Sequence, residues 1–194
     1  MDNKRKGESE RSAGRSGSHR VYYREYESPV GRLRLVERDG FLTAVSLAGK
    51  SQPDAYRRRG ELSYEEAGYL LAEAGAQDTE TELLARVHRE LTEYFAGQRR
   101  EFTAPLKPEG TPFQMQVWQA LRTIPYGETR SYGQIAAQIG KPGASRAVGM
   151  GNHYNPIAIL IPCHRVIGAD GSLTGYGGGL DIKEYLLKLE GILC

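Results

Sequence analysis

Residues 111–154 read TPFQMQVWQALRTIPYGETRSYGQIAAQIGKPGASRAVGMGNHY, and this segment governs the architecture of the second half of the chain. Thr111 can cap a helix, and Pro112 suits the first helical position. Apolar residues then recur at helical spacing from Phe113 to Leu121. This spacing predicts a helix with one face packed against a core.

Two further helices are predicted in the same segment. One begins at Ser131, buries Ile135 and Ile139, and is broken by the Gly-Lys-Pro sequence at 140–142. The other spans residues 143–154. A helix, a short glycine-containing turn and a second helix form the outline of a helix-turn-helix unit, which indicates nucleic-acid binding.

The helix predicted at 143–154 has few long side chains apart from Arg146 and Met150. A helix that reads bases in the major groove carries several side chains that reach the base edges. This helix is better suited to close contact with DNA, with Arg146 protruding. Tight packing between helices is the alternative explanation of its small residues. The DNA contacts expected here are Ala144, Ser145, Arg146 and Gly149.

Charge is unevenly distributed along a chain whose net charge is +2. Residues 111–165 hold five Lys and Arg residues against Glu128, a net charge of +4. A polyanion could approach such a segment without repulsion. Chance depletion of carboxylates in an apolar segment is the alternative explanation.

Cys163 follows the apolar run IAILI at 157–161, which predicts a short buried strand that Pro162 ends. An inert apolar filler is the simplest role for a lone cysteine. However, the adjacent His164 and Arg165 can favour the thiolate through charge and hydrogen bonds. The glycine-rich loop GADGSLTGYGGGLD that follows could wrap a planar ligand. We therefore expect a reactive thiol at the edge of a core.

The first half of the chain predicts a small sheet with one helix. Alternating apolar residues around Asp39-Gly40 predict a hairpin over residues 33–45. Residues 50–80 are polar and predict a loop with at most one short helix. A helical stripe runs from Leu84 to Tyr94 and ends near Gly97. Residues 1–20 have no apolar periodicity and predict a disordered tail.

The length of the chain, its number of cysteines and the length of its apolar stretches limit the class of protein. The chain has 194 residues and two cysteines, which are too few for a disulfide framework. Its strongest apolar stretch, at 156–162, is too short to span a bilayer. These features favour a reducing intracellular compartment: the cytoplasm, with the nucleoid of a bacterium or the nucleus of a eukaryote as the location of a DNA-binding protein.

Several motifs, in order and at the expected spacing, resemble those of the methylated-DNA–protein-cysteine methyltransferases, the O6-alkylguanine-DNA alkyltransferases. The resemblance runs from about Tyr23 to Gly191. The motifs are SPVGRLRLV, FQMQVWQALRTIPYGETRSYGQIA, SRAVG, NP, IPCHRV and GGLDIKEYLLKLEG.

The resemblance implies roles for residues of the catalytic site. Cys163 becomes the alkyl acceptor. His164, acting through a water, and Glu190 form the relay that takes its proton. Asn155 braces the turn near the site, and Tyr132 helps to rotate the nucleotide out of the helix and binds the purine.

The resemblance also implies a DNA contact and a substrate pocket. Arg146 fills the gap left in the base stack. Tyr176 and Val166 line the pocket, together with Lys183, which is expected before the last helix. Some members have a serine after the pocket tyrosine, but this chain has Gly177, so only a backbone N–H remains to meet the guanine oxygen.

The family implies an α/β (α+β) fold with two domains. Residues 21–105 form a ribonuclease H-like domain of sheet and helix, and residues 106–194 form a winged-helix-like domain that binds DNA and accepts the alkyl group. No cofactor is implied. Some members bind zinc through N-terminal cysteines, but residues 1–162 contain no cysteine, so no metal is expected.

The implied function is DNA repair by a single transfer of an alkyl group from O6-alkylguanine, and from O4-alkylthymine, to the cysteine after base flipping. The expected partner is double-stranded DNA that carries the lesion, bound by a monomer, with clustering on DNA left open and no membrane involved. Two alternatives differ in outcome. A cysteine hydrolase should turn over, and a non-enzymatic lesion sensor or regulator should not need Cys163.

Overall fold

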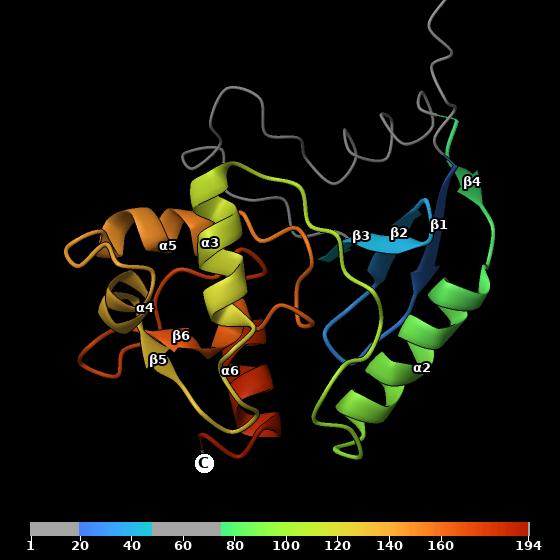
Figure 1. Ribbon diagram of the computed structural model, residues 1–194. Coiled ribbons are helices and arrows are strands. Elements are labelled where there is room, and N and C mark those ends of the chain that lie inside the picture. The colour runs from blue at the N-terminus through green and yellow to red at the C-terminus, as the bar shows by residue number, and fades with distance from the viewer. Residues whose placement is uncertain (1–19, 48–74, 194) are drawn as a thin grey trace, which may run out of the picture.

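The computed structural model describes residues 20–47 and 75–193 (Figure 1). A sheet with helix α2 lies beside a cluster formed by α3, α4, α5 and α6. The tail predicted at 1–20 falls outside the described residues apart from Arg20, as does most of the loop predicted at 50–80. No helix within the described ranges is long and apolar enough to cross a membrane.

Four strands form the N-terminal sheet, in the order β3-β2-β1-β4. The first three are antiparallel neighbours, and the short fourth strand pairs parallel with the first. The predicted hairpin is confirmed, because Asp39 and Gly40 take φ values of 52° and 81°, as a two-residue type I′ turn requires. The strands are β1 (Val21–Tyr26), β2 (Leu33–Arg38), β3 (Phe41–Leu47) and β4 (Gln77–Asp78).

Helix α2 (Glu82–Phe95) packs against this sheet, as Figure 1 shows. The Thr81 side chain caps its first turn, and Gly97 follows its end with φ of 72°. His88 is half-buried on this helix and stacks on the ring of Tyr26 at 3.8 Å between centroids. The apolar stripe is confirmed, with Leu84, Val87, Leu91 and Tyr94 buried.

The predicted helix-turn-helix region is confirmed as three packed helices. Thr111 and Ser131 each form a capping box with a glutamine three residues later. Of these three helices, the one that begins at Ser145 contacts both others. The short parallel pair that joins the segment before α4 to the one after Cys163 was not predicted. The elements are α3 (Pro112–Leu121), β5 (Arg130–Ser131), α4 (Tyr132–Gln138), α5 (Ser145–His153), β6 (Val166–Ile167) and α6 (Leu180–Leu189).

Strand β3 connects the two parts of the molecule. Leu42 N donates to Pro105 O at 2.9 Å, in the connector before α3. Val45 N donates to Pro156 O, also at 2.9 Å, in the segment that leads to Cys163. The chain approaching the cysteine is therefore anchored on the N-terminal sheet.

The prediction of a strand at 157–161 is wrong, although the segment is largely buried as expected. It makes isolated bridges instead of a ladder, and Ile159 takes a left-handed φ of 72°. The Asn155 side chain bonds the backbone of Ile157 and Ile161, so the chain folds back on itself. It then enters the 3₁₀ turn η2 (Cys163–Arg165).

Candidate active site

Cys163 opens η2 and is 5% exposed. Its Sγ accepts a hydrogen bond from Asn155 Nδ2 at 3.1 Å. The same amide nitrogen donates to Ile161 O at 2.8 Å. Asn155 therefore lies where the sequence predicts, within the turn before the cysteine, and also contacts the sulfur.

The expectation that the thiolate is favoured at rest is wrong for the free protein. Burial raises the pKa of Cys163, and the Asn155 hydrogen bond and the charge of Lys183 only partly offset this effect. Arg165 does not compensate, because its guanidinium is bound to Glu190 and to Ile124 O. A buried sulfur without a close cation stays a neutral thiol.

His164 and Glu190 form a buried pair, with 2.8 Å between His164 Nε2 and Glu190 Oε1 and no exposure of either side chain. Burial lowers the pKa of His164, against the opposing influence of Glu190. Burial by itself would raise the pKa of Glu190, but hydrogen bonds from His164 and Arg165 hold it at about 2. At neutral pH the pair is an imidazole and a carboxylate.

These charges determine the tautomer of His164. An ionised carboxylate only accepts hydrogen bonds, so Nε2 must carry the proton of the neutral ring. Nδ1 then has a free lone pair, and no described residue hydrogen-bonds to this buried atom. The ring therefore presents a base on the atom that Glu190 does not hold.

Glu190 has further partners that the sequence analysis did not assign to it. Arg165 Nε donates to Oε2 at 2.8 Å, and Gly127 N donates to the same oxygen at 3.4 Å. The Tyr94 hydroxyl donates to Oε1 at 2.7 Å. A tyrosine inside an otherwise aliphatic stripe was the available signal, because a buried phenol needs a polar partner.

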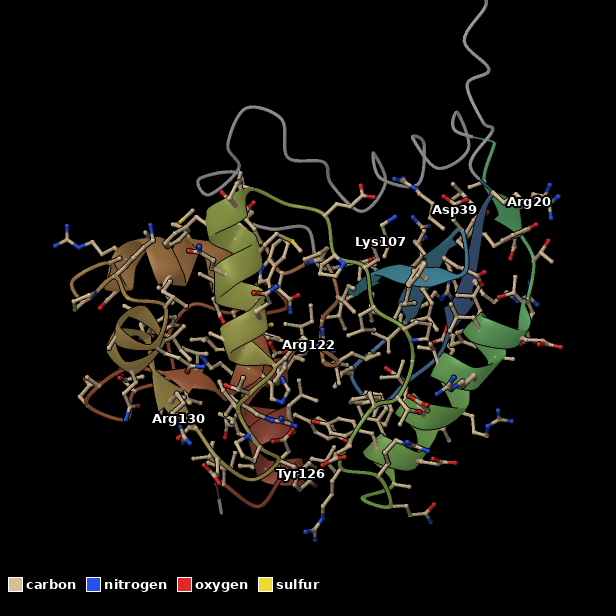
Figure 2. The ribbon with its side chains drawn as sticks, in the orientation of Figure 1. Arg20, Asp39, Lys107, Arg122, Tyr126 and Arg130 are labelled. Atoms are coloured by element: carbon tan, nitrogen blue, oxygen red, sulfur yellow. The ribbon has the colours of Figure 1, made fainter. Side chains whose placement is uncertain are left out.

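Tyr126 lies between α6 and the C-terminal end of α2 (Figure 2). Its hydroxyl donates to Leu189 O at 2.9 Å, next to the carboxylate of Glu190. Its ring is in edge contact with Tyr94, and the Arg165 guanidinium lies 5.8 Å from its centroid. The buried pair of His164 and Glu190 is thus enclosed by side chains from several elements.

Tyr132 and Lys183 both bind the loop that follows Cys163. The Tyr132 hydroxyl donates to Thr174 O at 2.9 Å, and Lys183 Nζ donates to the same oxygen at 2.7 Å and to Val166 O. Lys183 was expected before the last helix but lies within α6, fully buried. Burial lowers its pKa to about 8, so the amine remains largely charged at neutral pH.

The predicted pocket residues lie around the same loop. Val166 is fully buried and Tyr176 is 9% exposed. No described residue hydrogen-bonds the buried Tyr176 hydroxyl. Burial raises the pKa of Tyr176 well above the usual value, and the thiolate of Cys163, when it forms, acts in the same direction. Gly177 is half-buried, next to Gly178, where a Cβ would lie 2.6 Å from Leu47 Cδ1.

Two glycines of helix α5 lie against side chains of other helices, which supports the packing explanation of its small residues. A Cβ on Gly151 would lie 3.3 Å from Val117, so this glycine serves helix packing. Gly149 instead faces the ring of Tyr132, with 3.8 Å to a Cβ placed there. Arg146 is exposed, and Ala144 and Ser145, at the start of the helix, are half-buried.

Asn152 is a neighbour of the cysteine that the sequence analysis missed. This α5 residue is 2% exposed, and its Nδ2 donates to Cys163 O at 3.2 Å. It therefore ties the helix that carries Arg146 to the turn that carries the thiol. No spacing pattern in the sequence distinguishes Asn152 from the other polar residues of 152–155, so its role could not be predicted.

Two comparisons place these residues in a known family. Residues 21–108 match the family model described as 6-O-methylguanine DNA methyltransferase, ribonuclease-like domain, and residues 112–192 match its DNA binding domain. A methylated-DNA–protein-cysteine methyltransferase of Methanosarcina acetivorans is 48% identical over 175 residues, covering 88% of this chain and 99% of the relative. The chain belongs to this family. A constitutive methyltransferase of Bacillus subtilis is 43% identical over 172 residues, covering 88% of this chain and 96% of the relative.

Solved structures of the methyltransferase family agree. The O6-methylguanine methyltransferase of Mycobacterium tuberculosis matches with a TM-score of 0.73 at 46% identity, covering 88% of this chain and 92% of that chain. The structure of the same organism's OGT in complex with DNA matches with a TM-score of 0.69 at 46% identity, covering 87% and 92%. The family, the two-part α/β fold and the methyltransferase class predicted from the motifs are confirmed.

The buried pair at the centre of this methyltransferase should make its stability depend on pH. His164 and Glu190 both have pKa values below their ordinary ones in the folded protein. As the pH falls, the unfolded chain therefore binds more protons at these two residues than the folded chain does. Stability should therefore decrease from about pH 6.5 downward as His164 resists protonation. It should decrease again from about pH 4.5 toward 2, because the stability that the ionised Glu190 contributes, about 3 kcal/mol, is lost as the carboxylate is protonated.

Urea unfolding between pH 8 and pH 3 checks this expectation. Glu190→Gln should unfold with a flatter pH dependence than the wild-type chain below pH 4.5. Parallel curves for the two proteins would show that the pair does not carry the effect.

Proposed function

We propose that the protein transfers an alkyl group from O6 of guanine, and from O4 of thymine, in duplex DNA to Cys163, once per molecule. The carrying observation is the arrangement of the relay: the buried thiol of Cys163 is followed in sequence by a neutral imidazole, and Nε2 of that imidazole lies 2.8 Å from Oε1 of an ionised carboxylate. Such an arrangement supplies a base to a thiol that burial keeps protonated.

The proposed reaction is a single displacement. The thiol proton passes through a water to His164 Nδ1, and Glu190 stabilises the resulting imidazolium. Sγ attacks the alkyl carbon, the new S–C bond forms, and the bond from that carbon to O6 breaks. The leaving guanine carries the negative charge, which the Tyr132 hydroxyl relieves by hydrogen bonding. The product is a thioether that no neighbouring group can cleave, so the protein acts once.

Access to the lesion requires base flipping, because a stacked base cannot reach the sulfur. Arg146 is exposed on α5 and would fill the gap in the stack. Ala144, Ser145 and Gly149 allow the DNA backbone to come close to the helix. The flipped purine would then meet Tyr176 and the backbone of Gly177, while Lys183 holds the loop in place through its carbonyl contacts.

DNA is the partner that the matched DNA binding domain supports. We propose that the lesion-bearing duplex is bound by one copy of the chain, in the cytoplasm or wherever the genomic DNA lies. The absence of long base-reading side chains on α5, apart from Arg146, supports binding that depends on salt more than on sequence.

Methyl transfer from duplex DNA containing O6-methylguanine with a labelled methyl group tests the proposal. Label should appear on the peptide that contains Cys163 and should be absent from Cys163→Ala. A lesion sensor would bind the duplex and leave the label on DNA. A hydrolase would release the label into solution and continue to turn over.

A further inference from the structure

Tyr94 belongs to α2 in the N-terminal part of the chain, yet its hydroxyl reaches the carboxylate at the end of α6. The hydroxyl donates to Glu190 Oε1 at 2.7 Å between residues 96 positions apart in sequence. Tyr94 is fully buried, so water does not substitute for this contact. The N-terminal domain therefore contributes a polar group to the relay itself.

One oxygen of Glu190 serves three donors. Oε1 accepts from the Tyr94 hydroxyl at 2.7 Å, from His164 Nε2 at 2.8 Å and from Arg165 Nη2 at 3.0 Å. Each donor withdraws charge from the same oxygen and weakens its interaction with the other two. The strength with which Glu190 holds the imidazole therefore depends on whether the phenol is present.

We infer that Tyr94 is a positioning residue of alkyl transfer, and that its hydrogen bond to Glu190 Oε1, the oxygen that also binds His164 Nε2, sets the basicity of His164. The inference rests on the proposed role of His164 as the base. Without the phenol, the carboxylate would bind the imidazolium more tightly. The ring would then take up a proton at a higher pH and lose its function as a base earlier on acidification.

The other groups around the pair do not duplicate this contact. Arg165 of η2 carries a fixed charge and binds both carboxylate oxygens. Lys183 of α6 donates to loop carbonyls, and the Tyr126 hydroxyl donates to Leu189 O. Removing the Tyr94 hydroxyl thus leaves every charge near the relay in place.

The test is the rate of methyl transfer from an O6-methylguanine duplex to the full-length protein between pH 5 and pH 9. Tyr94→Phe keeps the ring, with its contacts to Phe102 and Tyr126, and removes only the donor. The midpoint of the acid limb should rise by about half a pH unit. Tyr26→Phe is the matched control, because the Tyr26 hydroxyl donates to Glu80 at 3.0 Å, outside the relay, and should leave the midpoint unchanged.

An unchanged midpoint in an active Tyr94→Phe protein overturns the inference, even if the variant is less stable. Failure of the wild-type protein to accept methyl at any pH would instead defeat the proposed function. If Tyr94→Phe does not fold, NMR of the wild-type protein decides. A slowly exchanging Tyr94 hydroxyl proton close to the His164 Nε2 proton supports the inference, and absence of that contact overturns it.

Discussion

Glu190→Gln is expected to slow alkyl transfer to Cys163 by roughly a thousandfold, within the range by which general-base catalysis accelerates reactions. A neutral amide cannot stabilise the imidazolium that forms when His164 takes the thiol proton. The same change should lower the free energy of unfolding by about 3 kcal/mol, because it leaves the buried Arg165 guanidinium without its carboxylate.

Single-turnover rates with an O6-methylguanine duplex, together with urea unfolding, measure both effects. Glu184→Gln is the matched control on the same helix. Glu184 is 49% exposed and pairs with Lys188 at 3.0 Å, so its loss should cost less than about 1 kcal/mol and leave the rate unchanged. A Glu190→Gln protein that reacts at the wild-type rate would remove the Glu190 carboxylate from the mechanism.

Arg146→Ala is expected to slow transfer from duplex DNA by about 30-fold at saturating DNA. Arg146 is exposed on α5 and would occupy the space of the flipped base, so its loss removes about 2 kcal/mol that offsets unstacking. Reaction with the free O6-methylguanine base needs no flipping and should slow less than about twofold.

Arg122→Ala separates this effect from loss of positive charge. Arg122 follows α3, is exposed and belongs to the same positively charged segment (Figure 2). Its loss should at most weaken DNA affinity, and saturating DNA should restore the rate. Equal slowing of Arg146→Ala on duplex and free base would contradict the role of a stack-filling residue.

Local signals in the sequence predicted much of this structure. Asp39-Gly40 marked the hairpin, Thr111 and Pro112 marked the start of α3, and Ser131 marked that of α4. These features depend on residues close in sequence, where capping and turn chemistry act. The pairing of His164 with Glu190 came from a family resemblance and not from spacing.

Features that depend on tertiary contacts were not predictable in this way. The bond from Tyr94 to Glu190 spans 96 positions, and a helical stripe shows only that Tyr94 is buried. The apolar run at 157–161 favours a strand, but Asn155 takes up its backbone groups and folds it into a turn. The protonation of Cys163 depends on burial and on where Arg165 points, which the order of residues does not reveal.

The most direct measurement of the central claim is the intact mass of the protein after incubation with excess duplex containing O6-methylguanine. The mass should rise by a single methyl group and then stop changing, with the added group on Cys163 and one lesion repaired for each protein molecule. An unmodified Cys163, or repair of many lesions by each molecule, would contradict the claim.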